Sequence, residues 1–183
     1  MSPKIRIVQA RQGHARSLSL GASAFRVDCE LVLALQGGLL SYRVVSVPPY
    51  EKRYPAQQPA PEVKRLTQPA SFLAYVDDEM AGQIVISEHW TGFANLDHIA
   101  VESEFRRRGV GSALLERATA WSTENALHGV RVETQSNNIA ACKLYERGGF
   151  RLRGFDQDLY RGFGAQQNET AMFWYWYPSG SHT

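Results

Sequence analysis

Apolar and polar residues alternate along several short runs of this 183-residue chain, and turn-forming residues separate the runs. Such alternation predicts extended strands. Strands are expected at Lys4–Ala10, Cys29–Leu35, Leu39–Val47, Ser71–Val76, Gln83–Glu88, Phe93–Val101, Val130–Gln135, Phe150–Phe155 and Ala171–Tyr177. Gly37-Gly38 and Asp77-Asp78-Glu79 stand between consecutive runs, and both predict hairpin turns.

Helical spacing replaces the alternation in three segments. Gly111–Glu124 places Leu114, Leu115 and Ala118 on one face, which is typical of an amphipathic helix. Asn138–Arg147 predicts a shorter helix that ends at two glycines, and residues 12–20 predict another. The order of elements is βαββ, then ββ, then βαβαββ, which predicts an α+β fold with a mixed sheet.

Six of the eight prolines lie between Pro48 and Pro69. Proline removes a backbone donor and biases the preceding residue toward extended backbone, so we expect a loop over residues 48–69. A chain of 183 residues is typical of one domain. We therefore expect a single domain over residues 1–178, with this loop inside it and a short tail at 179–183.

Composition narrows the class of protein. The chain is 44% hydrophobic and 21% charged, which indicates a globular protein. A formal net charge of +2 gives no case for a nucleic-acid partner, and no apolar run reaches the ~20 residues of a membrane span. The N-terminus lacks an apolar signal region. Cys29 and Cys142 have no metal-ligand spacing, so we expect reduced thiols, no metal, and a cytoplasmic protein without a membrane partner.

The segment Glu104-Phe105-Arg106-Arg107-Arg108-Gly109-Val110-Gly111-Ser112 lies between a predicted strand and a predicted helix. Glycines let the backbone turn tightly, and the first N–H groups of a helix attract anions. Three arginines add positive charge suited to phosphate. The segment therefore predicts a pyrophosphate cradle at residues 106–112. It matches neither the Walker A pattern nor GxGxxG, which argues against nucleoside triphosphates and dinucleotides.

Two motifs resemble those of the GNAT acetyltransferases. The first is Leu96–Val101 followed by Glu104-Phe105-Arg106-x-x-Gly109-x-Gly111-Ser-Ala-Leu-Leu, which is similar to the acetyl-CoA-binding motif of that family. The second is Val132-Glu133-x4-Asn138-x-x-Ala141-x-x-x-Tyr145-Glu146-x-x-Gly149-Phe150. Together they cover about residues 84–156. The resemblance implies the family's fold, a central mixed, mostly antiparallel, splayed sheet flanked by helices.

The same resemblance implies acetyl-CoA as cosubstrate and assigns residues to it. The pantetheine arm is expected beside the strand that ends at Val101, the pyrophosphate at the glycine loop, and further contacts on the second motif. The residues implied are Ile99, Ala100, Val101, Arg106, Arg107, Arg108, Gly109, Val110, Gly111, Ser112, Asn138 and Tyr145. Asn138 also suits a helix cap, and the two roles are compatible.

Further segments are similar to the streptothricin (nourseothricin) acetyltransferases within that family. They are Phe25-Arg26-Val27-Asp28, Val47-Pro48-Pro49 and Gly154-Phe155-Asp156-x-Asp158-Leu159-Tyr160-x-Gly162. This resemblance implies acetylation of the β-lysine amine of the antibiotic, and hence resistance. Because the antibiotic is polycationic, an acidic pocket is expected, and the resemblance places Asp28, Asp156 and Asp158 there. Ordinary turn chemistry explains Asp156 and Asp158 equally well.

Acetyl transfer by direct attack of an amine, in a ternary complex, needs an acid for the thiolate and a base for the amine. Tyr145 is the candidate acid, with core packing as its alternative role. Glu133 lies in the middle of a strand, where an unpaired carboxylate is costly, and the resemblance makes it the first candidate base, because some family members use a glutamate at this site. Asp97 is second and His98 third, and each could instead form a salt bridge. Glu133 and Asp97 are also expected near the substrate amine.

Two other functions remain open. The same cofactor motifs would serve a GNAT enzyme that acetylates a polyamine or a protein or peptide amine. A non-catalytic CoA-sensing or nucleic-acid-binding module could use the arginine triplet, although Tyr145 and Asn138 argue for an enzyme. The aromatic run Phe173–Tyr177 predicts a two-sided strand that packs in the sheet or at the contact of a homodimer.

Overall fold

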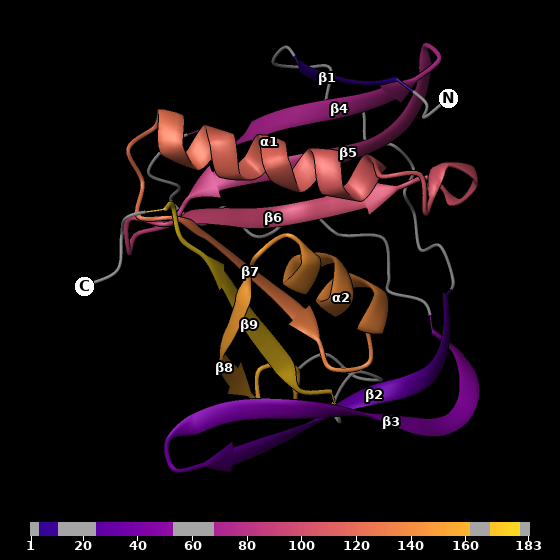
Figure 1. Ribbon diagram of the computed structural model, residues 1–183, viewed down its shortest axis with the longest axis vertical. Coiled ribbons are helices and arrows are strands. Elements are labelled where there is room, and N and C mark those ends of the chain that lie inside the picture. Colours follow the sequence, from indigo (N-terminus) through magenta and orange to yellow (C-terminus); the bar gives the residue numbers. More distant parts are fainter. Residues whose placement is uncertain (1–3, 11–24, 53–67, 162–168, 180–183) are drawn as a thin grey trace. The chain divides into compact units, whose positions relative to one another are not determined.

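The alternation seen in the sequence produces strands β1 to β9 in the part of the chain that the structure, a computed structural model, describes: residues 4–10, 25–52, 68–161 and 169–179 (Figure 1). The chain divides into two units. The first unit comprises residues 1–21, 55–131 and 176–183, and the second comprises residues 22–54 and 132–175. This division does not test the prediction of one domain over residues 1–178, which stays a prediction.

The first unit is an antiparallel sheet. β1 (Ile5–Gln9), β4 (Ala70–Val76), β5 (Glu79–Glu88) and β6 (Ala94–Val101) neighbour one another in that order. β6 also pairs in parallel with the first residues of β7 (Val130–Gln135), through Ala94 with Val130 and Asn95 with Arg131. This mixed, mostly antiparallel arrangement confirms the predicted α+β class.

Two aspartates form the tight turn between β4 and β5. Asp77 and Asp78 have φ angles of 49° and 65°. A two-residue hairpin turn that matches the twist of its strands needs positive φ at both central residues, and aspartate adopts this conformation more readily than most residues do. The turn that the sequence predicts at this point is therefore confirmed.

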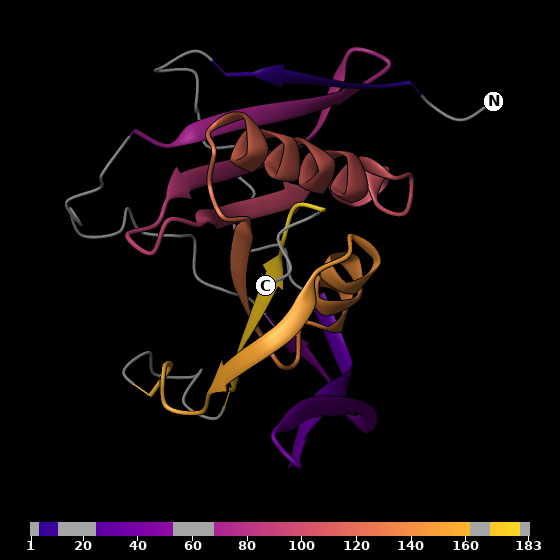
Figure 2. The ribbon, with the colours of Figure 1, turned by 60° about the vertical axis from the view of Figure 1, so that its left-hand side comes forward.

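Helix α1 (Val110–Glu124) packs against β1, β4, β5 and β6 of the first unit, on one face of their sheet (Figures 1 and 2). Its buried positions follow the helical period that the sequence predicts: Val110, Leu114, Leu115, Ala118 and Ser122. Each large apolar side chain buried in this way contributes about 1.5–3 kcal/mol to folding. The hydroxyl of Ser122 donates to the carbonyl of Gly129 at 2.8 Å, which satisfies the buried polar group.

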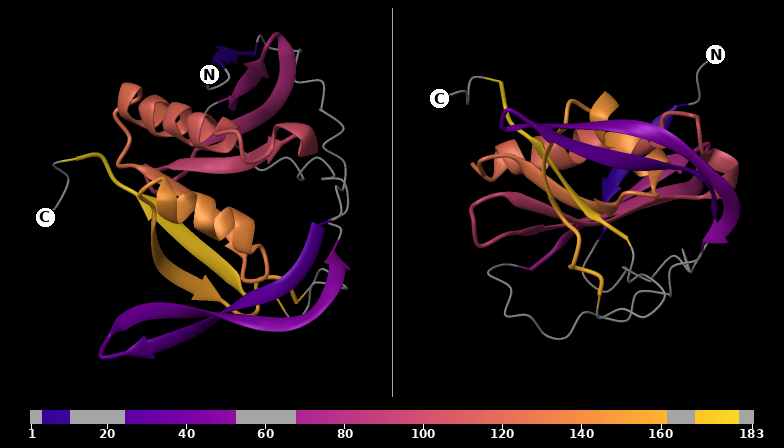
Figure 3. Two further views of the ribbon diagram at one scale, coloured as in Figure 1. Left: turned by 45° about the vertical axis from the view of Figure 1, so that its right-hand side comes forward. Right: turned by 90° about the horizontal axis from the view of Figure 1, so that it is seen from below.

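The second unit contains a long twisted hairpin of β2 (Phe25–Gln36) and β3 (Leu39–Lys52), which Figure 3 shows in two views. Gly37 and Gly38 form its turn with φ angles of 56° and 78°, as the sequence predicts. The hairpin is longer than expected, because β3 continues through Pro48 and Pro49 to Lys52.

The other elements of the second unit are the rest of β7, α2 (Ile139–Arg147), β8 (Arg151–Asp156) and β9 (Ala171–Trp176), with strand order β7-β9-β8. Trp174, Met172, Cys142 and Tyr145 are all 3% exposed or less. β9 buries Trp174 while Phe173 and Tyr175 are half-buried, so it is the two-sided strand that its composition predicts. Both cysteines are free thiols, as expected.

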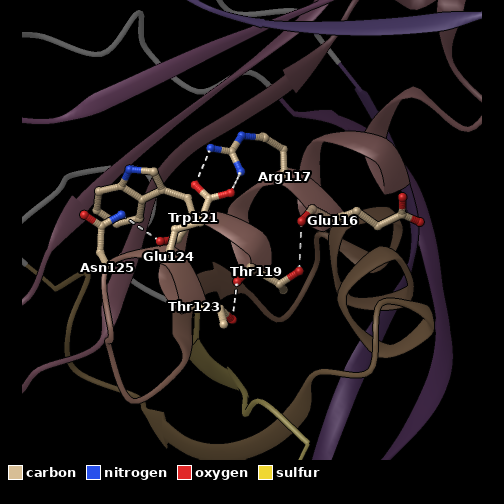
Figure 4. A network of polar contacts seen from close by, with 7 residues as sticks. All are labelled: Glu116, Arg117, Thr119, Trp121, Thr123, Glu124 and Asn125. Atoms are coloured by element: carbon tan, nitrogen blue, oxygen red, sulfur yellow. Dashed lines mark hydrogen bonds and ion pairs between the residues drawn. The ribbon is translucent and has the colours of Figure 1, made fainter.

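Polar side chains of α1 and of the residue after it form hydrogen bonds within this segment (Figure 4). Arg117 donates two hydrogen bonds to the carboxylate of Glu124, at 2.9 and 2.8 Å, and its guanidinium carbon lies 4.4 Å from the ring centroid of Phe72 on β4. At the end of the helix, the amide of Asn125 donates to the carbonyl of Trp121 at 2.8 Å. The helix that carries the glycine loop is thereby held at its outer surface as well as in the core.

The structure corrects the predicted boundaries of the proline-rich loop. Residues 48–52 are strand, and Pro48 and Pro49 are tolerated because the ladder has an irregularity there: Val27 pairs with Tyr50 but Cys29 pairs with Ser46. Proline has no N–H to donate, so an interrupted ladder accommodates it. Residues 53–67 and the predicted helix at 12–20 lie outside the described residues. A 3-10 helix, η1 (Ser103–Phe105), was not predicted.

None of the described helices combines the length and the apolar character that a membrane span requires.

Gly82 allows α1 to lie close to β5, and its replacement tests this packing. A Cβ at residue 82 would stand 2.6 Å from the carbonyl oxygen of Ala100 and 3.3 Å from Cδ1 of Leu114. We expect Gly82→Ala to lower the free energy of unfolding by about 1–3 kcal/mol, because backbone must move to relieve the collision. Urea or thermal unfolding measures the change.

Gly154→Ala is the matched control in another strand, because a Cβ there meets Phe173 at 3.7 Å, an ordinary contact. We expect this substitution to change stability by less than about 1 kcal/mol. Equal effects of the two substitutions would contradict the packing argument.

Candidate active site

The glycine loop ends in a left-handed backbone at the start of α1. Gly109, directly before the helix, has φ of 86° and ψ of −4°, which a residue with a Cβ adopts only with strain. The first helical bond runs from the N–H of Ala113 to the carbonyl of Gly109 at 3.0 Å, so the N–H groups of residues 110–112 precede it. The first turn carries no acidic side chain. This end of α1 therefore favours an anion.

The three arginines of the loop have different surroundings. Nε of Arg106 donates to the carbonyl of Val101 at 3.1 Å, which fastens the loop to the end of β6. The guanidinium carbon of Arg108 lies 5.6 Å from the ring centroid of Phe105, the buried residue of η1. Arg107 is exposed and has a positive φ of 63°. The geometry thus distinguishes three residues that the sequence pattern treats alike.

Asp97 occupies a bulge in β6. Val85 of β5 pairs with His98 and the next residue, Ile86, pairs with Leu96, so Asp97 is an extra residue between two rungs of the ladder. A bulge leaves the extra residue outside the regular pairing and redirects its side chain, and bulges are common next to active sites. The strand predicted here is therefore present, with an irregularity at one of its candidate bases.

The carboxylate of Asp97 is linked to a cation through an amide. Its Oδ1 accepts from Nδ2 of Asn95 at 2.7 Å, and Oδ1 of Asn95 accepts from Arg131 at 3.1 Å. Burial lowers the pKa of the neighbouring His98, which keeps its imidazole neutral near pH 7. Asp97 thus belongs to a polar network with Asn95 and Arg131. His98, with its lowered pKa, is a weak base.

The end of β6 carries the backbone expected beside the cosubstrate. Residues 99–101 pair with Ile84, Gln83 and Gly82 of β5 along one edge. Along the other edge, the pairing of β6 with β7 comprises Ala94 and Asn95, so residues 96–101 lie beyond that ladder. Their backbone groups on this edge suit a ligand that runs alongside a strand.

Tyr145, the candidate acid, lies in the core of the second unit. Its side chain is 3% exposed, and its ring centroid lies 5.8 Å from that of Phe150 and 6.5 Å from that of Trp174. Burial raises the pKa of Tyr145 above its ordinary value, and Cys142 and then Glu133 raise it further. The phenol therefore keeps its proton throughout the neutral range, as a proton donor must.

Glu133 and Asn138 accompany Tyr145 in the second unit. The charge of Glu133 helps to raise the pKa of Tyr145, and Oε1 of Glu133 is shielded from solvent. Oδ1 of Asn138 accepts from the N–H of Ala141 at 3.2 Å, which confirms the predicted cap of α2. The structure thus brings Tyr145, Glu133 and Asn138 into one unit, whereas Asp97 and the glycine loop belong to the other.

The three aspartates expected in an acidic pocket have separate environments. Oδ1 of Asp156 accepts from the N–H groups of Asp158 and Leu159, at 2.8 and 3.0 Å, in a turn after β8. Asp158 pairs with Arg161 at 2.6 Å. Asp28 is 63% exposed, with its carboxylate 4.0 Å from Nε of Arg26. Asp156 and Asp158 therefore form the turn contacts that the sequence analysis gave as the alternative to substrate binding.

Sequence reasoning missed a polar network beside the start of α2. Oη of Tyr50 donates to Oε1 of Glu30 at 3.2 Å and accepts from Nδ2 of Asn137 at 3.1 Å. Lys52 forms an ion pair with Glu169 nearby. Tyr50 and Lys52 were missed because they fall in the segment predicted as a loop. The alternation of Asp28 with Glu30 along β2 is a signal that could have drawn attention to Glu30.

A second tyrosine–glutamate pair lies in an open hollow of about 710 Å³ in the second unit, which β3, the end of α2, β8 and Trp174 line. Oη of Tyr42 donates to Oε1 of Glu146 at 2.5 Å, and burial followed by this bond raises the pKa of Tyr42 to about 12. None of the predicted site residues lines this hollow.

In the described part of the chain, no three His, Cys, Asp or Glu residues lie close enough together to hold a metal ion.

Comparison with known proteins matches residues 40–150 to the Acetyltransferase (GNAT) family. The streptothricin acetyltransferase of Escherichia coli is 39% identical over 145 residues, which is 79% of each chain. Streptothricin acetyltransferase A of Bacillus subtilis is 35% identical over 153 residues, covering 83% of this chain and 88% of that protein.

A solved structure extends this similarity to the fold. A candidate streptothricin acetyltransferase from Bacillus anthracis, crystallised in complex with acetyl coenzyme A, matches with a TM-score of 0.83 at 30% identity. The match covers 96% of this chain and 100% of that one.

Replacement of Gly109 tests the anion-binding end of α1. A Cβ at residue 109 has room, with Cδ1 of Ile5 the nearest atom at 3.6 Å, so the cost of Gly109→Ala lies in the left-handed backbone. That cost is about 1–2 kcal/mol, and relief of the strain would move the N–H groups of residues 110–112. We expect acetyl coenzyme A to bind about tenfold more weakly, as measured by isothermal titration calorimetry.

Gly38→Ala is the control. Gly38 has a similar φ of 78° and a Cβ there meets nothing within 4 Å, but it lies at the tip of the hairpin. We expect a comparable loss of stability with unchanged affinity. If Gly109→Ala binds acetyl coenzyme A as tightly as the unaltered protein does, the phosphate cradle lies elsewhere.

Proposed function

Because this chain belongs to the acetyltransferase (GNAT) family, we propose that it transfers the acetyl group of acetyl coenzyme A to an amine of a streptothricin-type antibiotic and so gives resistance. The observation that carries the proposal is the extent of the similarity. The two streptothricin acetyltransferases match over 145 and 153 residues, well beyond the region of the family motifs. The amine acetylated is that of the β-lysine group, as the sequence resemblance implies.

The residues present fit acetyl coenzyme A. When bound, it supplies an acetyl thioester. The N–H groups of residues 110–112 bind its phosphates at the end of α1, and the left-handed turn at Gly109 lets the backbone approach them. Arg106 holds the loop to the end of β6 through Val101. The backbone of Ile99, Ala100 and Val101 aligns the pantetheine arm.

Tyr145 donates the proton that the departing thiolate takes up. Its raised pKa keeps the phenol protonated, and packing against Phe150 and Trp174 holds the ring in one orientation. Asn138 caps the helix that carries Tyr145, and its amide nitrogen serves as a donor to the cosubstrate arm.

Glu133 accepts a proton from the ammonium group of the acceptor, which then attacks the thioester as a neutral amine. The electrostatic influence of Glu133 on Tyr145 supports this role, since acid and base must both reach the reacting centre. Asp97 is the second candidate; its Oδ1 accepts from Asn95, whose own Oδ1 accepts from Arg131. His98 remains third. Asp28 contributes negative charge for the polycationic substrate, with Asp156 and Asp158 at the turn after β8.

Release of free thiol from acetyl coenzyme A tests the proposed function. We expect turnover that depends on streptothricin and is far slower with spermidine or with a short peptide at the same concentration. Expression in a streptothricin-sensitive bacterium should raise the inhibitory concentration of the antibiotic. Turnover with the polyamine or the peptide alone would point to another GNAT acceptor, and no turnover with any acceptor would indicate a non-catalytic module.

Kinetic measurements distinguish the proposed role of Tyr145 from that of Glu133. Tyr145→Phe keeps the ring but removes the proton, so kcat should fall by about 10²–10⁴ while acetyl coenzyme A binds nearly as before. Glu133→Gln should lower kcat/KM most at low pH, where the substrate amine is charged and must lose a proton. Raising the pH should recover part of that loss, because more of the amine is then neutral. Steady-state rates from pH 6 to 9 measure both effects.

Full kcat in Tyr145→Phe would remove the phenol from the mechanism. A Glu133→Gln defect that does not vary with pH would transfer the role of base to Asp97, and Asp97→Asn should then show the pH-dependent loss instead.

A further inference from the structure

The turn between β7 and α2 holds the β2–β3 hairpin by two hydrogen bonds. The N–H of Leu31 donates to the carbonyl of Ser136 at 2.9 Å, and Nδ2 of Asn137 donates to Oη of Tyr50 at 3.1 Å. The next residue, Asn138, caps α2. One strand is attached through the backbone and the other through a side chain, so both are held beside the helix that carries Tyr145.

The phenol of Tyr50 is oriented toward Glu30. Because Asn137 donates to Oη, the hydroxyl hydrogen is directed to Oε1 of Glu30, 3.2 Å away. Partial burial raises the pKa of Tyr50, and Glu30 adds to this, so the phenol stays neutral and remains a donor. Among the described residues, Tyr50 is the one hydrogen-bond donor to Glu30, which leaves Oε2 of this half-buried carboxylate for a ligand.

The surrounding charges favour a cationic ligand. Lys52 and Glu169 form an ion pair whose side chains are 11% and 8% exposed. Burial lowers the pKa of Lys52, and the charge of Glu30 opposes that shift. The carboxylates of Glu30 and Glu169 and the ammonium group of Lys52 sum to a formal charge of −1, and this excess of negative charge attracts a cation.

We propose that Glu30, held in place by Tyr50, binds a cationic group of the acceptor other than the amine that is acetylated. The inference rests on the proposed function. Tyr145 lies seven positions after Asn138, roughly 10 Å along the helix axis. A carboxylate held at the start of α2 therefore contacts a different part of a polycation than the part beside Tyr145. Glu30 selects acceptors that carry a second ammonium or guanidinium group, and neither Asp28 nor the turn aspartates supply this contact.

Kinetics with streptothricin as the varied substrate test the proposal. Glu30→Gln keeps the shape of the side chain but removes its charge, and should raise the KM for streptothricin at least tenfold, the size expected for losing a hydrogen bond to a charged group. The KM for acetyl coenzyme A, kcat and the shape of the pH profile should stay as in the unaltered enzyme. Tyr50→Phe loses only the bond that orients the carboxylate, so its KM for streptothricin should rise about threefold.

The Tyr42–Glu146 pair supplies matched controls. It has the same chemistry, begins on the same strand as Tyr50, and lies in the hollow that none of the predicted site residues lines. Glu146→Gln and Tyr42→Phe should leave the KM for streptothricin unchanged. Melting temperatures of all four variants check that they fold, and Tyr50→Phe carries the test if Glu30→Gln does not fold.

The outcomes separate the two proposals. If the unaltered enzyme does not acetylate streptothricin, the proposed function is wrong and this inference with it. If the unaltered enzyme is active and Glu30→Gln keeps its KM for streptothricin, only the inference is overturned. A fall in kcat with an unchanged KM also overturns it, because Glu30 would then act in the chemical step and not in binding.

Discussion

The left-handed backbone of Gly109 sets the direction in which α1 leaves its loop, and the anion-binding end of the first unit depends on it. The N–H groups of residues 110–112 precede the first helical bond, as they do at the start of any α-helix, and the turn at Gly109 leads directly into them. Arg106 ties the loop to β6, and the missing side chain at Gly82 lets α1 lie close to β5. We therefore propose that backbone geometry and close packing position the phosphates, with arginine charge as a supplement.

The turn at residues 136–138 has a comparable role in the second unit. Ser136 receives a backbone hydrogen bond from β2, Asn137 holds Tyr50 of β3, and Asn138 caps α2. Three consecutive polar residues therefore connect the hairpin to the helix that carries the candidate acid. The two residues proposed for acceptor recognition and proton donation, Glu30 and Tyr145, therefore belong to one structural unit.

Burial sets the chemistry of the individual groups. It raises the pKa of the Tyr145 phenol and of the Cys142 thiol, so the first retains a proton to donate and the second stays un-ionised near neutral pH. Burial also lowers the pKa of His98, which removes its charge. Carboxylates are then the groups left to carry negative charge toward a cationic amine; Asp97 accepts a hydrogen bond from Asn95, and Glu133 helps to raise the pKa of Tyr145.

Local patterns alone predicted most of the elements, because strand and helix periods are properties of neighbouring residues. The hairpin turns at Gly37 and Asp77, the cap at Asn138 and the helix over residues 110–124 all follow from short segments. The family motifs predicted the fold and the acetyltransferase class for the same reason, since their residues lie close together in the sequence. The site residues named from those motifs stay predictions.

Only the tertiary structure decided which distant side chains meet. β3 extends through two prolines because an irregularity in its pairing with β2 spares their missing N–H groups, and this interruption is invisible in β3 alone. Tyr50 meets Glu30 and Asn137 across 20 and 87 residues of sequence, and the bulge at Asp97 depends on the register of β5. Such contacts depend on strand register and on burial, which arise only when segments far apart in the chain pack together.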